Sequence, residues 1–308
     1  MKNLQLHKKE HQRLIKAFSE WLSLQGYAAQ TVYNLPIYTK EFLHYLEHEN
    51  IDLSQLTAEM IQGYFFHLRV RPKCKGGGKT RKKQRGNGVL SLNSLINHRR
   101  GLLQFSKYLK ETDQYYFQVD VPLEKIERKI KTILTTTEIK SLYEICEHSP
   151  LGLRDRAMLS IYYGLGLRRT EGVSLDVSDY MPEKKMLYVR KGKNYKERYV
   201  PLTPEIKEDL EGYLYYGRPL QIKHVGTTAF FLSERGGRLT GQSMILRLKR
   251  LMEKAEITKE NIGLHSLRHS IATHLLQSGM PLKQIALFLG HESIESTQIY
   301  THIINEIE

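Results

Sequence analysis

Residues 264–290 read LHSLRHSIATHLLQSGMPLKQIALFLG, and this stretch decides how the second half of the chain folds. Apolar residues recur at helical spacing in two runs, and a glycine follows each run, at Gly279 and at Gly290. The apolar positions are Ile271, Ala272 and Leu275 in the first run and Leu282, Ile285, Ala286 and Leu289 in the second. The stretch therefore predicts two consecutive helices, each closed by a glycine.

The first predicted helix carries candidate anion ligands near its N-terminus. His265 and Arg268 are three residues apart, so they are neighbours where backbone N–H groups already favour an anion. A guanidinium can donate two parallel hydrogen bonds to phosphate, and an imidazole can move a proton near neutral pH. Taken alone, either residue is better explained as a polar residue on the surface, or, for His265, as a core histidine whose hydrogen bonds the backbone satisfies. His265 and His269 also have the spacing of a helical zinc site, but Ser266 replaces its glutamate and no third ligand is obvious.

Two further candidates follow the second predicted helix. His291 comes directly after Gly290, and Tyr300 lies nine residues later, on a short helix expected to begin near Ser293 or Ser296. A phenol with an ordinary pKa of about 10 is a weak nucleophile and needs an electropositive pocket beside its target phosphate. Taken singly, Tyr300 is one of 19 tyrosines, and aromatic packing explains it equally well.

The composition of the 308-residue chain indicates a polyanionic partner. There are 47 Lys and Arg against 33 Asp and Glu, a formal net charge of +14, which favours nucleic acid. A membrane surface is the rival, but the chain has no apolar run of about 20 residues, and its start lacks the apolar core of a signal peptide. A cytosolic protein is expected. Cys74 and Cys146 are far apart and are interpreted as incidental thiols.

The N-terminal part, residues 1–111, is predicted to be a small helical bundle without strands. Apolar positions at helical spacing define successive helices, with Gly26 closing the first, Thr57 capping the third and Ser91 capping the fourth. Pro36 in the second helix is tolerable only within its first turn. The residues expected to pack are Leu14, Ile15, Phe18, Trp21, Leu22, Phe42, Leu43, Leu46, Met60, Ile61, Tyr64, Phe65, Leu68, Leu95, Leu102 and Leu109.

A basic loop, residues 69–88, interrupts this bundle. Residues 69–85 hold nine basic and no acidic side chains together with three consecutive glycines, so we expect a mobile segment that contacts phosphates by counterion release. A solvated loop without a partner is the simpler alternative for such a run. The candidate DNA contacts are Lys79, Arg81, Lys82, Lys83 and Arg85, together with Arg99 and Arg100 on the polar side of the fourth helix.

Residues 112–134 are predicted to be an interdomain linker, and a second domain follows over residues 135–308. Residues 135–137 can cap its first helix, and another helix should cover residues 154–163. Residues 186–189 and 198–202 are expected to form a hairpin around a basic turn, and residues 230–232 a further short strand. Thr203 and Pro204 begin another helix, and helices continue from about residue 241. This domain is expected to be mostly α with a small antiparallel sheet.

Six positions together resemble the signature of the tyrosine recombinases. His265 and Arg268 lie in His-Ser-Leu-Arg-His, His291 lies in Leu-Gly-His, and Tyr300 follows. Arg168 lies in Gly166-Leu167-Arg168-Arg169-Thr170-Glu171, and Lys191 begins a segment similar to the family's Gly-Lys-Gly-Asn-Lys-Glu-Arg turn. The match is strong over residues 135–302. It implies a mainly α protein with an N-terminal helical core-binding (SAM-like) domain and a C-terminal α-rich catalytic domain with a small antiparallel sheet.

The resemblance also implies a reaction. Tyr300 would attack the scissile phosphate to form a 3′-phosphotyrosine, and Arg168 and Arg268 would clamp that phosphate. Lys191 would protonate the departing 5′ oxygen, while His265 and His291 assist proton transfer and stabilise charge. No metal or ATP is expected, because arginines stabilise the charge that Mg²⁺ stabilises in other phosphoryl transfers. The implied partner is double-stranded DNA with a specific recombination site, bound by a homo-tetramer on two sites or together with a related recombinase.

The chain departs from the family pattern at several places. The hairpin turn has one extra residue, so Lys193 and Lys196 compete with Lys191 for the acid role. Gly172 stands where a bulky apolar residue is usual, which is expected to loosen the helix behind Arg168. The isoleucines near the end could dock on a neighbouring protomer or belong to a frayed tail; they are Ile303, Ile304 and Ile307.

Three functions remain open on this reading. The first is a site-specific recombinase acting in integration, excision, inversion or dimer resolution, with an Xer-like organisation expected from the lack of an additional N-terminal domain. The second is a type IB topoisomerase, which shares the cleavage chemistry but relaxes supercoils as a monomer. The third is a DNA-binding protein that keeps the fold without cutting. The six intact positions speak against the third, and the chain size and the spacing from Gly290-His291 to Tyr300 favour the first.

Overall fold

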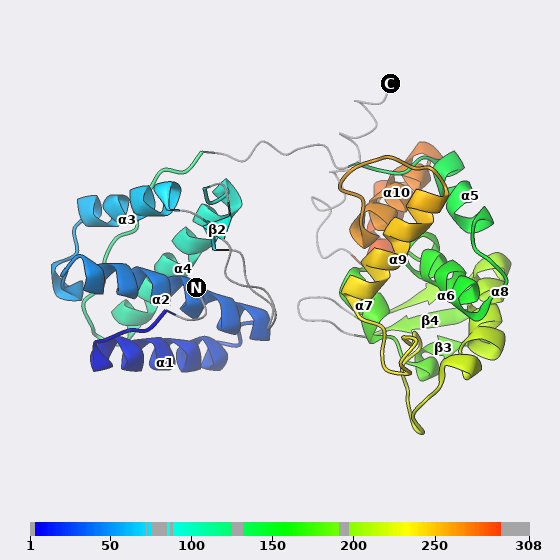
Figure 1. The fold of residues 1–308 in the computed structure, drawn as a ribbon, viewed down its shortest axis with the longest axis horizontal. Helices are drawn as coiled ribbons and strands as arrows, with labels where there is room; N and C mark the ends of the chain where they lie inside the picture. Colours follow the sequence, from blue (N-terminus) through cyan, green and yellow to red (C-terminus); the bar gives the residue numbers. More distant parts are fainter. Residues whose placement is uncertain are drawn as a thin grey trace. The chain divides into compact units, whose positions relative to one another are not determined.

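The computed structural model describes residues 4–71, 73–74, 85–86, 89–124, 132–190 and 197–290. The chain divides into two compact units, Met1–Arg128 and Lys129–Glu308, each with its own hydrophobic core (Figure 1). Helices dominate both units, and a small antiparallel sheet lies in the second. The expected mainly α fold is confirmed.

The first unit is a helical bundle around an aromatic core. Its helices are α1 (Lys9–Leu24), α2 (Ala29–His48), α3 (Ala58–Val70) and α4 (Leu92–Glu111), with a 3-10 turn at Leu53–Gln55. Thr57 and Ser91 cap α3 and α4 as predicted, because each side-chain oxygen accepts from the backbone N–H three residues on. Phe18, Phe42 and Phe105 are fully buried between the helices.

The prediction for Pro36 is wrong. Pro36 lies in the interior of α2, not in its first turn, and is buried. A proline there removes the N–H that would bond to the carbonyl of Val32. The helix continues because tertiary packing outweighs that loss: α4 approaches α2 so closely that a Cβ on Gly101 would lie 3.0 Å from Cβ of Tyr38.

The expected absence of strands in this unit is also wrong. Lys73–Cys74 (β1) and Arg85–Gly86 (β2) pair antiparallel at the base of the basic loop, with Cys74 opposite Arg85. Backbone pairing needs no apolar side chains, so the hydrophobic pattern gave no sign of it. We predicted that the residues between these strands are mobile. Those residues lie outside the described part of the chain, so this stays a prediction.

The segment after α4 belongs to the first core. Phe117, Val119 and Val121 alternate along an extended stretch and are buried against the bundle. Ser106 on α4 also donates to the carbonyl of Phe117, which ties the stretch down. Within the predicted linker, residues up to Leu123 therefore pack on the first unit, and the division of the chain into units falls between Arg128 and Lys129.

The second unit is built from short helices around a three-stranded sheet. Its α-helices are α5 (Thr136–Glu144), α6 (Pro150–Leu159), α7 (Arg169–Ser174), α8 (Pro204–Glu211), α9 (Gly241–Lys254), α10 (Leu264–Gln277) and α11 (Leu282–Leu289). π-Helical turns extend α6 over Ser160–Gly164 and α8 over Gly212–Gly217, and 3-10 turns occupy Val177–Asp179, Pro182–Lys184 and Pro219–Gln221. Thr135 caps α5 in a reciprocal pair with Glu138, and Thr203 caps α8, both as predicted.

The sheet has the order β3-β4-β5 and is antiparallel throughout. β4 (Met186–Val189) and β5 (Arg198–Pro201) form the predicted hairpin, with Val189 opposite Arg198. β3 (Tyr180–Met181) was not expected, because two residues are too short for a period-two signal. The prediction of a strand at residues 230–232 is wrong. Isolated β-bridges form at Ala229 and Leu232 instead, and Phe230 and Phe231 pack in the core.

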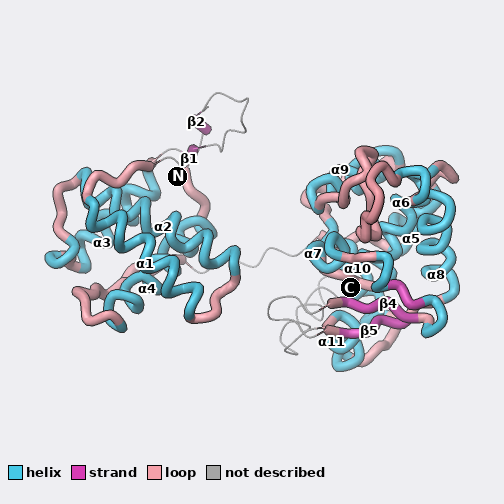
Figure 2. Tube along the Cα trace, turned by 90° about the horizontal axis from the view of Figure 1, so that it is seen from below, coloured by secondary structure: helices cyan, strands magenta, loops and turns pink. Residues whose placement is uncertain are grey.

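The two helices predicted from residues 264–290 are present as α10 and α11. Gly279 and Gly290 both adopt positive φ, 86° and 65°, which glycine alone adopts without strain. The end of α11 lies against β5, where Gly290 meets Arg198 (Figure 2). This packing brings the second strand of the hairpin to the end of the last described helix.

Candidate active site

The turn before α7 places the first arginine of the site. Gly166 has φ 60° and a Cβ there would lie 2.7 Å from a methyl of Leu289, so only glycine fits. Arg168 is the N-cap of α7, and its backbone N–H donates to Oε2 of Glu171 at 2.8 Å. Its Nη1 donates to Oε1 of the same carboxylate at 2.8 Å. Glu171 therefore fixes both the main chain and the side chain of Arg168.

Two further arginines reach the same carboxylate from distant elements. Arg198, the first residue of β5, donates from Nη1 and Nη2 to the two oxygens of Glu171 at 3.1 and 3.0 Å. Arg268 on α10 brings Nη1 to 3.9 Å from Oε2 of Glu171. We call Arg168, Arg198, Arg268 and Glu171 the arginine cluster.

Backbone carbonyls hold the arginines in place from the other side. Arg268 is 3% exposed and donates to the carbonyls of Gly166 at 2.5 Å and Leu289 at 2.7 Å. Arg168 donates from Nη2 to the carbonyl of Gly290 at 2.8 Å. Consecutive carbonyls at the end of α11 thus bind the two arginines that the sequence predicted as a pair. Gly290, whose carbonyl binds Arg168, is the residue before His291.

The cluster is electropositive and keeps its carboxylate ionised. Burial alone would raise the pKa of Glu171, but the hydrogen bonds and charges of Arg198 and Arg168 outweigh it and lower the pKa to about 2. Three guanidiniums against one carboxylate leave a net charge of +2. Such a site favours an anion with more than one negative oxygen, such as a phosphodiester approaching a pentacoordinate transition state.

The hairpin that carries Lys191 is anchored at both strand ends. Arg190 follows β4 and donates to Asp176 at 2.7 Å and to Asp179 at 3.0 Å, while Arg198 at the start of β5 binds Glu171. Partial burial would raise the pKa of Asp176, but bonds from Arg238, Arg190 and Thr228 lower it to about 2. The turn between these anchored ends, residues 191–196, lies outside the described residues.

The structure describes only three of the six predicted catalytic residues, Arg168, His265 and Arg268. Arg168 and Arg268 are brought together through Glu171 and the end of α11. His265 is exposed in the first turn of α10, whereas Arg268 on the next turn is buried. Lys191, His291 and Tyr300 lie outside the described residues, so their roles stay predictions.

Sequence reasoning missed Glu171 and Arg198 as site residues. Glu171 had a local signal, because an acid three residues after an N-cap is the spacing of a capping pair. Arg198 matches the arginine that ends the family's Gly-Lys-Gly-Asn-Lys-Glu-Arg turn, but that match did not indicate which residue it binds. Its role depends on the approach of α7 and α11, which are distant in the sequence.

The candidate DNA contacts of the first unit are only partly described. Arg100 on α4 is exposed, whereas Arg99 is half-buried and its Nε is buried without a hydrogen-bond partner in the described part of the chain. Arg85 lies in β2, where only the main chain is described. Lys79, Arg81, Lys82 and Lys83 lie outside the described residues.

The described residues contain no group of three or more His, Cys, Asp or Glu side chains arranged to hold a metal ion. None of their helices is long and apolar enough to span a membrane.

The family model for the phage integrase family matches residues 132–306, which include the arginine cluster, Lys191, His291 and Tyr300. The chain belongs to the tyrosine recombinases of the phage integrase family. Named members of this family are recombinase enzymes, and the arginine cluster lies within the matched region. The predicted membership of the tyrosine recombinase family is therefore confirmed.

Relatives of this tyrosine recombinase include proteins matched over most of their length. The tyrosine recombinase XerD of Yersinia pestis is 30% identical over 305 residues, covering 97% of this chain and 95% of that protein. The tyrosine recombinase XerC of Oceanobacillus iheyensis is 38% identical over 191 residues, covering 61% of this chain and 62% of that protein. That second match spans less than two thirds of the relative.

Among solved structures, the XerH site-specific recombinase bound to difH substrate in a pre-cleavage complex has a similar fold. The TM-score is 0.70 at 22% identity, and the match covers 96% of this chain and 83% of that one. At this identity the likeness concerns the fold.

Proposed function

We propose that this tyrosine recombinase cleaves and rejoins DNA at a specific site through a 3′-phosphotyrosine formed by Tyr300. The phenolic oxygen attacks the scissile phosphorus and passes its proton to His265 or His291, and the bond from phosphorus to the 5′ oxygen breaks. Lys191 donates the proton that the departing 5′ oxygen takes up. A 5′ hydroxyl of another strand then attacks the phosphotyrosine, which releases Tyr300 and rejoins the DNA. His265 and His291 assist proton transfer and stabilise charge.

The arginine cluster is the observation that carries this proposal. Arg168 and Arg268 are preorganised by Glu171 and by the carbonyls at the end of α11, so little reorganisation is needed when a phosphate arrives. Charge builds on the non-bridging oxygens in the transition state, and fixed guanidiniums stabilise it more than they stabilise the ground state. The carbonyl of Gly290, which binds Arg168, directly precedes His291 in the chain, which favours use of the cluster beside the segment that bears Tyr300.

The proposed substrate is a duplex, and the proposed assembly is a tetramer on two sites. The formal charge of +14 supports a polyanionic partner such as duplex DNA. The basic loop of the first unit would contact backbone phosphates, while the second unit would supply the chemistry. Integration, excision, inversion and dimer resolution all use this reaction.

The test is covalent trapping on a nicked duplex. Genomic fragments of the source organism that the protein retains are shortened to candidate sites and nicked beside the expected cleavage position. Attack then releases a short strand that diffuses away, and the protein stays linked to DNA through a denaturing gel. The native chain should give this adduct, and Tyr300→Phe should give none. An adduct that persists in Tyr300→Phe excludes Tyr300 as the nucleophile.

Arg168→Lys and Arg268→Lys keep the positive charge but lose the planar fork, so each should slow adduct formation by about 100-fold or more. Duplex affinity serves as the control and should change much less. Strand exchange between two labelled sites then distinguishes recombination from the relaxation of supercoils by a monomer. Relaxation without exchange would replace the proposed function with that of a topoisomerase.

A further inference from the structure

Gly172 on α7 leaves a space that another buried residue occupies. A Cβ on Gly172 would lie 2.6 Å from both Cζ and Oη of Tyr162 and 2.9 Å from its Cε1. Tyr162 lies in the π-helical turn after α6 and is fully buried. The expected loosening of α7 by Gly172 is therefore wrong, because the phenol ring of Tyr162 fills the position that a side chain on α7 would take.

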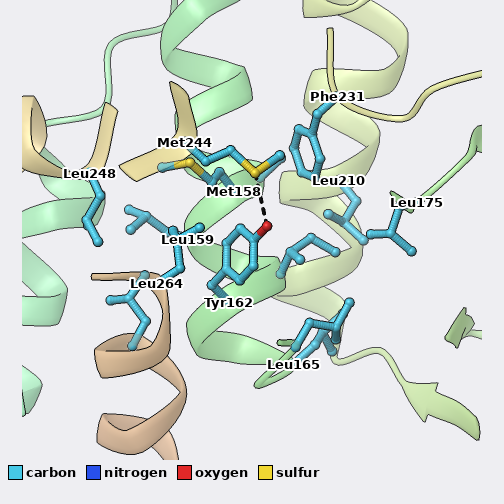
Figure 3. Close-up of a cluster of buried hydrophobic side chains, with 14 of the residues drawn as sticks. Met158, Leu159, Tyr162, Leu165, Leu175, Leu210, Phe231, Met244, Leu248 and Leu264 are labelled. Carbon is cyan, nitrogen blue, oxygen red and sulfur yellow. Dashed lines mark hydrogen bonds between the residues drawn. The ribbon is translucent and has the colours of Figure 1, made fainter. Parts of the chain in front are cut away.

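The hydroxyl of Tyr162 joins α7 to a neighbouring helix. Its single O–H is shared between two acceptors, the carbonyl of Arg169 at 3.2 Å and Sδ of Met244 on α9 at 2.9 Å, and Figure 3 shows the bond to Met244. Burial raises the pKa of this phenol above its ordinary value, so the hydroxyl keeps its proton at neutral pH and can donate. Its ring packs among core residues of the second unit.

These contacts fall beside the two cluster residues that α7 carries. Arg169 directly follows Arg168, and Gly172 directly follows Glu171. α7 spans only Arg169–Ser174, so a helix this short takes its position from its neighbours. A shift of α7 would move Glu171 away from Arg198, which comes from β5.

We propose that Tyr162 is a positioning residue for the cleavage reaction, which sets the place of Arg168 and Glu171 by filling the space at Gly172 and by holding the carbonyl of Arg169. This inference rests on the proposed function for its catalytic consequence. Its structural consequence is independent of DNA. Tyr162 and Gly172 act as one fitted pair, so a change at one is tolerated only with a matching change at the other.

The first measurement uses the free, full-length chain. The carboxyl carbon of Glu171 is followed by NMR as the pH is lowered in the native chain, in Tyr162→Phe and in Gly172→Ala. In the native chain this carboxyl should stay ionised until the pH approaches the value at which acid unfolds the protein. Displacement of α7 weakens the bonds from Arg198, burial then dominates, and protonation of Glu171 should begin at higher pH in both variants, more so in Gly172→Ala.

The second measurement is the single-turnover rate of adduct formation on the nicked duplex. Tyr162→Phe and Gly172→Ala should slow it by about 10- to 100-fold, because small misplacements of catalytic groups have effects of that size. Affinity for the same duplex should stay within about twofold, since binding is dominated by phosphate contacts elsewhere. Tyr162→Leu combined with Gly172→Ala makes room for the new methyl group and should recover part of both losses.

Matched controls come from the same unit. Tyr213→Phe removes the hydroxyl of another fully buried tyrosine, which contacts Gln221 and the backbone of Leu232 and not α7. Gly212→Ala adds a methyl whose nearest atom is 3.7 Å away, on Leu153. Both controls should leave the Glu171 titration unchanged.

The outcomes separate the two proposals. An unchanged Glu171 titration in Gly172→Ala and Tyr162→Phe overturns the positioning role, whatever the cleavage result. If the Glu171 titration shifts in the variants but the native chain forms no adduct on any retained site, the positioning of α7 is supported and the proposed function is overturned. Shifted titration with an unchanged cleavage rate overturns the catalytic consequence of the inference.

Discussion

At the residue scale, Glu171 organises the candidate site because an ionised carboxylate is stable in the interior only when its oxygens are fully bonded. Arg198 donates to both oxygens and the side chain of Arg168 donates to Oε1, and the backbone N–H of Arg168 adds a fourth bond, to Oε2. Removing the carboxylate would leave guanidiniums facing one another without compensation. The arginine cluster is therefore one unit, and Glu171 belongs to it as much as the arginines do.

The effect of Glu171→Gln on the free energy of unfolding tests whether Glu171 holds the arginine cluster together. The folded pKa of Glu171 is about 2 against an ordinary 4.5, so its contribution is fully present above about pH 4.5 and is lost as the pH falls toward 2. The gap corresponds to about 3 kcal/mol of unfolding free energy. Glu171→Gln should destabilise the second unit by about 3 to 5 kcal/mol at neutral pH and flatten this acid dependence.

Urea unfolding at a series of pH values, followed by the methyl resonances of Met158 and Met244 in the second core, measures the effect. Glu183→Gln, at an exposed carboxylate of the same unit, is the control and should change neither quantity. An equal loss of stability in both variants would contradict the role of Glu171.

At the element scale, ion pairs hold both ends of the β4–β5 hairpin, whose turn contains Lys191. Arg190 binds Asp176 and Asp179 at one end, and Arg198 binds Glu171 at the other. Two strands of four residues each are too short to hold a hairpin rigidly by backbone pairing alone. The ion pairs thus define where the turn with Lys191 begins and ends.

Asp176→Asn should loosen the first of these anchors. Asp176 accepts from Arg190, Arg238 and Thr228, and an amide keeps one acceptor oxygen and no charge. Amide hydrogen exchange at the paired positions Val189 and Arg198 should accelerate by about tenfold or more. Glu183→Gln, in the 3-10 turn that precedes β4, is again the matched control. Unchanged exchange in Asp176→Asn would show that backbone pairing suffices.

The elements themselves were largely predictable because their signals are local. The caps at Thr57, Ser91, Thr135 and Thr203 follow from side-chain oxygens within three residues of the N–H groups they bind. Pro36 and β3 were not predictable on that basis. A buried contact with another helix keeps α2 continuous, and pairing with β4 alone defines β3.

At the scale of the whole molecule, the excess of positive charge is an argument about binding, not about the fold. Each phosphate contact that a basic side chain makes releases counterions, so affinity for a duplex falls with rising salt. The basic loop holds nine basic residues within 17 positions of the first unit. It is therefore the segment expected to contribute most to a salt dependence that is independent of sequence.

Replacing five basic residues of this loop by glutamine should lower the slope of log affinity against log salt by about 0.9 for each phosphate that the loop no longer neutralises. The residues are Lys79, Arg81, Lys82, Lys83 and Arg85. Fluorescence anisotropy of a labelled duplex over a salt series measures the slope. The charge-matched control replaces five exposed lysines of the second unit, Lys184, Lys185, Lys223, Lys249 and Lys254. Equal slopes for the two variants would assign the effect to net charge alone.

The sequence by itself determined the helices with their caps, the hairpin and the candidate catalytic residues, because spacing and residue type along the chain carry that information. Only the tertiary structure decided that Arg198 completes the cluster, that Tyr162 fills the space at Gly172 and that α2 runs through Pro36. Arg198 and Glu171 are 27 residues apart, and Arg268 is 102 residues from Gly166, one of the two residues whose carbonyls it binds. Contacts at such separations depend on how whole elements pack, and no local pattern along the chain encodes them.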